Sequence, residues 1–251
     1  QHTFVDAATN KGYDVLVMDG QLDMHFINQA ETKFKESRFS RVDADIVEKL
    51  ILKDDVTEVK LTAEQQEELR PVIQSQLKKD DHFYVVFENL SETAQPMMIT
   101  QSEFMRRMKD MSAMGGGNMG FYGELPDSYN LVVNANHPLV KKVIEGKEAA
   151  VTENIKPLKT QIELLEKELE AVEKTVKDKK DDEIDQATKD KRSDLEKKIE
   201  DTRKQKEEIL LNYGKGNDLV KQMIDLALLS NNMLKGEDLT KFIRRSVDMI
   251  K

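Results

Sequence analysis

The side chains that could carry out catalysis are few in this sequence. It has no cysteine, and none of its four histidines has a partner at metal-ligand spacing. A run of glycines at residues 115–117 lacks the lysine and the serine or threonine that follow a phosphate-binding loop. We therefore predict no catalytic residue, no metal site and no disulfide. The histidines are His2, His25, His82 and His137.

Methionine is the side chain that this sequence concentrates. Seven of the twelve methionines fall within the 23 residues from Met97 to Met119. Because methionine is soft and adaptable, it is common on surfaces that bind varied apolar segments. A helical face that packs into the core is the more common origin of such a stripe, and that interpretation stays open. The predicted binding residues are Phe104, Met105, Met108, Met111, Met114, Met119, Phe121 and Tyr122.

A helix between two predicted strands must carry most of these methionines. Thr100 and Glu103 have the spacing of a capping box, so we expect a helix to begin there and to end at the glycine run. The strands are predicted at Phe83–Phe87 and Met97–Ile99. They are expected to form a hairpin that Leu131–Val133 joins, which gives a small three-stranded sheet.

Residues 1–45 are interpreted as the end of a larger α/β domain. Tyr13–Met18 is predicted as a buried strand, residues 22–30 as a helix and Arg38–Val42 as a second strand. Two strands and one helix are too few to bury a core by themselves. We therefore expect this domain to begin upstream of the chain.

A second domain is predicted from residue 62 to residue 251, after a linker at residues 46–61. Its first helix is expected from about Thr62 to Lys79, with Thr62 as the N-cap. Pro71 should kink or break that helix, because proline lacks the backbone N–H.

Charge is concentrated in residues 147–214, where 35 of the 68 residues are charged, against 52 in the other 183. Apolar residues recur there at alternating spacings of three and four, which is the seam of a coiled coil. We predict a coiled-coil hairpin inserted into the second domain, beginning soon after a short helix at residues 139–144. The first arm has Ile155, Leu158, Ile162, Leu165, Leu169, Val172 and Val176, and the returning arm has Leu195, Ile199, Thr202 and Ile209.

Two helices predicted after the hairpin have more apolar surface than one partner helix can cover. The first is apolar almost all round, and the second, which Asp238 is expected to cap, has one apolar stripe. A symmetric interface with a second copy is where such burial is completed. The predicted interface residues are Leu219, Met223, Leu226, Ala227, Leu229, Leu239, Phe242, Ile243, Val247 and Ile250.

The overall charge argues against two classes of partner. With a net charge of −9 and a pI near 5.2, the chain has no general attraction to nucleic acid or to anionic lipid. No apolar run approaches the length of a membrane span, and the amino terminus has no signal-peptide pattern. A cytoplasmic location is therefore expected.

Five segments resemble one protein family. Leu131–Val140 is similar to a segment of the ninety-kilodalton heat-shock protein family in its bacterial, HtpG-type branch, with Ala135 in place of the usual proline. Gly12–Asp19 resembles a segment near the end of the middle domain of that family. Its terminal region is resembled by Ile224–Leu229, Leu234–Asp238 and Phe242–Arg245. The similarity covers most of the chain outside residues 147–214.

The resemblance implies a chaperone fragment with an α+β fold. It implies the end of a middle domain, followed by a dimerisation domain whose terminal helix pair forms a four-helix bundle with that of a second protomer. It also implies that the methionine-rich helix binds unfolded or partly folded client proteins. ATP and magnesium would bind upstream in the full-length protein, so this fragment is not expected to be an enzyme.

The inserted hairpin supports a second hypothesis. The chain is then a coiled-coil adaptor in which the hairpin recruits a partner and the globular regions anchor it. Within a chaperone, the hairpin would brace the dimer, enlarge its cleft or recruit a partner, and the sequence does not rank these roles.

Overall fold

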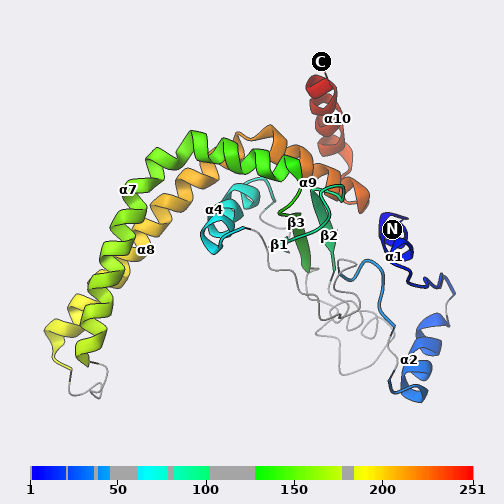
Figure 1. Ribbon diagram of the computed structural model, residues 1–251, viewed down its shortest axis with the longest axis horizontal. Helices are drawn as coiled ribbons and strands as arrows, with labels where there is room; N and C mark the ends of the chain where they lie inside the picture. Colours follow the sequence, from blue (N-terminus) through cyan, green and yellow to red (C-terminus); the bar gives the residue numbers. More distant parts are fainter. Residues whose placement is uncertain are drawn as a thin grey trace.

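The computed structural model describes residues 2–20, 22–36, 39–45, 61–78, 82–101, 128–176 and 184–250 (Figure 1). Within these residues the chain forms seven helices and one three-stranded mixed sheet. The predicted α+β class and the small sheet are therefore confirmed.

The sheet has a different topology from the one predicted. Its strands β1 (His82–Glu88), β2 (Met97–Thr100) and β3 (Ser128–Asn134) lie in the order β1-β3-β2. β3 runs parallel to β1 and antiparallel to β2, so the predicted hairpin between the first two strands is wrong. β3 lies at the centre, with a neighbouring strand on each edge, and it has a continuous buried run at Leu131–Val133.

Asn134, at the end of β3, holds the chain that connects β1 to β2. Its side chain is fully buried. The Oδ1 atom accepts a hydrogen bond from the backbone N–H of Leu90, and the Nδ2 atom donates to the carbonyl of Ser91 at 2.8 Å. Asn136 donates to the carbonyl of Leu90 in the same way. The polar residues of the segment that resembles the family therefore fix a loop.

Helix α4 (Ala63–Gln74) covers the sheet near β1. It begins as predicted, because Thr62 and Gln65 form a reciprocal capping box. The helix passes through Pro71 without a break and ends at Gln74, several residues before the predicted end. The Arg70 guanidinium donates to the carbonyl of Val85 and so anchors α4 to β1.

The amino-terminal segment contains α1 (His2–Asn10) and α2 (Asp23–Lys33). α2 confirms the predicted helix, whereas α1 has no counterpart in the sequence prediction. Residues 13–19 form no strand, and Val17 is 87% exposed. Residues 39–42 are also irregular. Both strand predictions are wrong, because a β-strand forms only where a neighbouring strand accepts its backbone hydrogen bonds, and no described residue does so here.

Two long helices, α7 (Pro138–Val176) and α8 (Gln186–Lys215), pack along each other and form a curved arm that leaves the sheet (Figure 1). The helix expected at residues 139–144 is not separate, since it is the first part of α7. All eleven residues of the two predicted apolar series are buried or half-buried. The arm starts at His137, whose Nδ1 atom accepts a hydrogen bond from the backbone N–H of Leu139 and whose pKa is lowered by burial.

The base of this arm lies inside the main hydrophobic core. Val151 and Ile155 of α7 and Leu210 of α8 belong to the same buried cluster as Leu131 of β3 and Ile224 near the carboxyl terminus. Part of the segment at residues 147–214 is therefore packed in the core that the sheet and the terminal helices share.

A buried ion cluster connects α4 to α7. The side chains of Glu68 and Lys147 are each 3% exposed and form an ion pair, and Lys159 also pairs with Glu68. Burial acts to raise the pKa of Glu68, but the hydrogen bonds and charges of the two lysines outweigh it and leave that pKa lowered. Because a buried charge is costly unless it is paired, this cluster fixes the position of α4 against the arm.

Replacing Glu68 should destabilise the protein strongly. We expect Glu68→Gln to lower the free energy of unfolding at pH 7 by about 3–5 kcal/mol, because it leaves Lys147 buried without an anion. Urea denaturation measures this change. The folded pKa of Glu68 lies below 4.5, so its stabilising effect is complete above that pH and is lost as the pH falls through the folded pKa. The difference between the two proteins should therefore shrink in acid.

The matched control is Glu67→Gln on the same helix. Glu67 pairs with Lys206 at 2.9 Å, and its side chain is largely exposed. We expect that control to cost about 0–1 kcal/mol, as for a surface ion pair. Equal losses at the two positions would contradict the role that we give to Glu68.

Gly214 allows α8 to approach α4 closely. A Cβ atom at this position would overlap the Val72 carbonyl and the Ser75 hydroxyl, and it would lie 2.8 Å from the Val72 Cα. The two helices are joined nearby by Gln76, which donates to the carbonyl of Gly214 at 2.6 Å.

We expect Gly214→Ala to destabilise the protein by about 1–3 kcal/mol, because α8 must move away from the α4 backbone. Gly216→Ala is the control, since the atom nearest to a Cβ there is 3.9 Å away and the backbone φ of −90° suits alanine. Thermal unfolding of both variants provides the measurement. A destabilisation at Gly216 as large as that at Gly214 would show that close packing is not the cause.

Candidate interaction surface

Helix α9 (Asp218–Ser230) follows α8 after only two residues. One of them, Asn217, caps α9 by accepting a hydrogen bond from the backbone N–H of Val220 at 3.0 Å. α9 packs against β2 and α7 and buries Val220, Met223 and Ile224. Its largely apolar sequence is therefore used mostly inside the protomer.

Helix α10 (Gly236–Ile250) projects away from the sheet, and the carboxyl terminus lies near its far end (Figure 1). Asn232 in the preceding turn and Gly236, the first residue of α10, have positive φ angles, which asparagine and glycine adopt most readily. Asp238 was predicted to cap this helix, but it lies within the first turn. Its carboxylate instead pairs with Lys78 at 2.7 Å, and this hydrogen bond lowers the pKa of Asp238.

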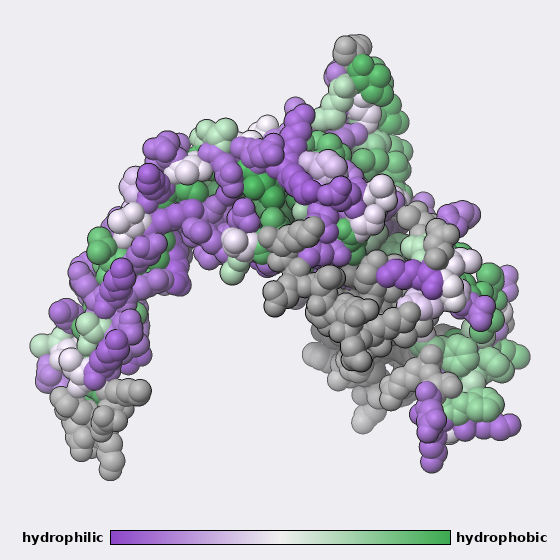
Figure 2. All heavy atoms as spheres, in the orientation of Figure 1, coloured by the Kyte–Doolittle hydropathy of each residue, from purple (hydrophilic) through white to green (hydrophobic). Residues whose placement is uncertain are grey.

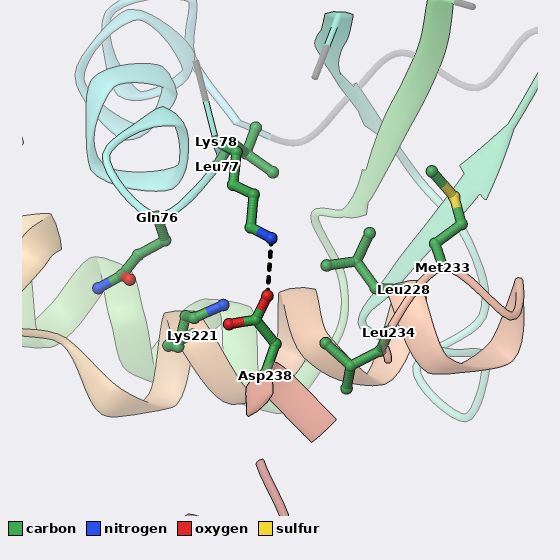
Figure 3. A pocket seen from close by; sticks show the side chains of 8 residues that line it. All are labelled: Gln76, Leu77, Lys78, Lys221, Leu228, Met233, Leu234 and Asp238. Carbon is green, nitrogen blue, oxygen red and sulfur yellow. Dashed lines mark hydrogen bonds and ion pairs between the residues drawn. The ribbon is translucent and has the colours of Figure 1, made fainter. Parts of the chain in front are cut away.

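A small pocket lies where α9 and α10 meet the end of α4 (Figure 3). Figure 3 shows the Lys78 side chain pointing from the segment that follows α4 to Asp238, with Leu228 and Leu234 beside this ion pair. The Lys78–Asp238 ion pair occupies the polar side of the pocket. We therefore interpret the pocket as part of the contact between the helices. The lining residues are Gln76, Leu77, Lys78, Lys221, Leu228, Met233, Leu234 and Asp238.

A second polar contact joins α9 to α10. Asp225 is 1% exposed, although it lies in the apolar helix α9. Its carboxylate pairs with Arg245 of α10 and with Lys221, each at 2.5 Å. Arg245 also donates to Gln222 at 2.8 Å. The buried carboxylate is thus satisfied by two cations, as its burial requires.

The residues predicted to form a dimer interface fall into three groups. Met223, Ala227 and Phe242 are buried inside the protomer, and Leu219 and Leu239 are half-buried. The other five are exposed and lie on the outer sides of α9 and α10. This exposed group comprises Leu226, Leu229, Ile243, Val247 and Ile250.

Three of the exposed residues, Ile243, Val247 and Ile250, make a surface on α10 that we call the α10 apolar face. Ile250 is 85% exposed. Figure 2 shows apolar residues gathered along one edge of α10. Met249 is exposed as well, and sequence reasoning missed it because it lies beside the stripe that helical periodicity defines. A contiguous apolar surface on a projecting helix is typical of a protein-binding site.

The predicted client-binding residues, Phe104 to Tyr122, all lie outside the described residues, as does Glu103 of the predicted capping box. Thr100 is described, and it is buried at the end of β2. The helical and client-binding interpretations of that segment therefore stay predictions.

The described residues contain no group of three or more histidine and acidic side chains arranged to hold a metal ion. None of the helices in the described part of the chain is long and apolar enough to cross a membrane.

Comparison with known proteins shows what this chain is similar to. The Hsp90 protein family matches residues 1–165. The Chaperone protein HtpG of Bacteroides thetaiotaomicron is 44% identical over 252 residues, which cover 100% of this chain and 37% of that protein. A Bacteroides fragilis HtpG is 46% identical with the same coverage, and a Porphyromonas gingivalis HtpG is 41% identical over 98% of this chain.

These similarities differ in extent. The family match ends within α7, at residue 165, whereas the similarity to the Bacteroides proteins continues through the arm and the terminal helices. The chain spans little more than a third of the length of these relatives.

Proposed function

Because this chain belongs to the Hsp90 protein family, we propose that it is the dimerising and client-contacting part of a molecular chaperone. The observation that carries the proposal is the α10 apolar face, which the protomer leaves exposed on a projecting helix. The α10 apolar face contributes little to packing within the protomer, which favours a role in binding another protein.

A second copy of the chain is the occupant that best suits the α10 apolar face. Exposed Leu226 and Leu229 on α9 supply a further apolar surface in the same terminal helix pair. A two-fold axis would bring this helix pair together with its counterpart, because the same surface is then used on both protomers. Two helices from each protomer would form a four-helix bundle.

Charged residues on the α10 apolar face should dissociate this dimer. We expect Ile243→Glu with Val247→Glu to give a monomer at tens of micromolar, because association would bury unpaired carboxylates. Sedimentation equilibrium reports the mass, and circular dichroism shows whether the helices persist. Phe242 is a poor choice for this test, since its burial inside the protomer means that a charge there would disturb the fold.

The control is Lys241→Glu with Arg244→Glu, which introduces charge at exposed polar positions of the same helix. It should leave the dimer intact. If the variant that combines Ile243→Glu and Val247→Glu is still dimeric, the interface lies elsewhere in the chain.

Client binding is the second part of the proposal. It is supported by the five methionines from Met105 to Met119, because adaptable apolar side chains accept varied apolar segments, whereas Met97 and Met98 belong to β2. Unfolded or partly folded proteins expose such segments. In the full-length chaperone, movement driven by ATP would alter how the client is held. We place ATP and magnesium in the remainder of that protein, and we assign no step to them in this chain.

The unaltered chain should suppress the aggregation of a chemically unfolded model protein. We expect the variant that combines Met108→Ser and Met111→Ser to suppress it several-fold less well. Light scattering measures that suppression, and the melting temperature of the variant should be unchanged. A lowered melting temperature would favour the alternative in which these methionines pack in the core. Met223→Ser provides a core comparison, because Met223 is a buried residue of α9 and its loss should lower the melting temperature.

We propose that the long arm is a coiled coil that extends the chaperone surface. The proposed location of the protein is the cytoplasm. The hypothesis that the chain is an adaptor built around this arm is not favoured. Residues at the base of the arm lie in the core shared with the sheet, so the base of the arm is part of the globular region and is not joined to it by a separate linker.

A further inference from the structure

Helix α10 is attached to the rest of the protomer by few apolar contacts. Of its 15 residues, Phe242 is the buried one. Leu234 and the turn before the helix fix where α10 starts, but not the direction of its axis or its rotation about that axis. Polar contacts must therefore set the orientation of a helix whose outer face is apolar.

Two ion pairs supply that orientation. Asp238 pairs with Lys78 in the segment that follows α4, and Arg245 pairs with the buried Asp225 of α9. Asp238 and Arg245 are seven residues apart, so they lie on the same side of α10, about 20° apart at 3.6 residues per turn. Both ion pairs therefore hold the same side of α10 against the rest of the protomer.

The α10 apolar face lies on the opposite side. Ile243 and Val247 are two residues before and two residues after Arg245, so each points about 160° away from it. Ile250 projects in nearly the same direction as these two. Holding Arg245 against α9 therefore turns the apolar face outward.

Arg245 is well suited to fix this rotation. Its side chain is 16% exposed, and its Nη2 and Nε atoms reach Asp225 and Gln222 at 2.5 Å and 2.8 Å. Gln222 in turn donates to Ser246 at 2.7 Å, so two neighbouring residues of α10 are held by the same part of α9. A planar guanidinium with two partners restricts orientation far more than a single ammonium contact does.

We propose that Arg245 and Asp225 form a latch that positions α10 for association with a second copy of the chain. Arg245 is thus a positioning residue for dimerisation, although it lies on the side of α10 that faces away from the partner. This inference rests on the proposed function, because the latch matters to association only if the α10 apolar face is the interface.

The test compares two neighbouring arginines of the full chain. We expect Arg245→Gln to raise the dimer dissociation constant at least about tenfold, because a helix whose orientation is no longer fixed must be ordered when the two copies associate. Arg244→Gln removes the same charge from an exposed position and should change the constant less than about twofold. Sedimentation equilibrium over a dilution series gives each constant.

Two further variants separate positioning from general loss of structure. Arg245→Lys keeps the charge and should restore part of the affinity lost in Arg245→Gln. Asp225→Asn combined with Arg245→Gln should weaken the dimer by clearly less than the sum of the two single losses, because both changes remove the Asp225–Arg245 contact. Circular dichroism of each diluted monomer should match that of the unaltered chain.

The outcomes distinguish the two proposals. If the unaltered chain is monomeric at all concentrations, the proposed dimerisation fails, and the latch fails with it. If the unaltered chain is a dimer but Arg245→Gln and Arg244→Gln have equal effects, only the latch is overturned. Additive losses from Asp225→Asn and Arg245→Gln would also overturn it.

Discussion

The buried carboxylate of Glu68 is the interaction on which the arrangement of the helices depends. Glu68 belongs to α4, which packs against both β1 and the long arm. Its charge is neutralised by Lys147 and Lys159 of α7. An unpaired charge at that depth would cost several kcal/mol, so α4 and α7 have little freedom to separate. The close contact at Gly214 then places α8 against the same helix.

This constraint extends to the carboxyl terminus. α8 is followed after two residues by α9, and Asn217, which caps α9, also donates to Tyr213 of α8 at 3.1 Å. α9 holds α10 through Asp225 and Arg245. The base of the arm and the proposed dimer surface are therefore joined by a continuous series of helices and polar contacts. A force on the arm would act near the proposed interface, which is a physical basis for coupling between the two regions.

The two terminal helices use their apolar residues differently. α9 has apolar residues on most sides and needs them, because the sheet and α7 cover much of its surface. α10 has one narrow stripe, and most of that stripe faces outward. Surplus apolar composition in α9 is thus explained mainly by burial within the protomer, whereas the modestly apolar α10 has the larger exposed surface. The argument for a dimer therefore depends more on α10 than the amino-acid composition of the two helices indicated.

Local patterns in the sequence determined the type of most elements. The Thr62 capping box, the run Phe83–Phe87 and the heptad series beginning at Ile155 are signals carried by residues close together in the chain, so they could be predicted directly. The family resemblance was also present in short segments. The tertiary structure decided strand order, the loss of the expected strand at Tyr13–Met18, and which apolar residues face outward. Each of these features depends on a partner far away in the sequence, as does the pairing of Glu68 with Lys147. Such long-range contacts could not be predicted, because they leave no periodic signal in the residues themselves.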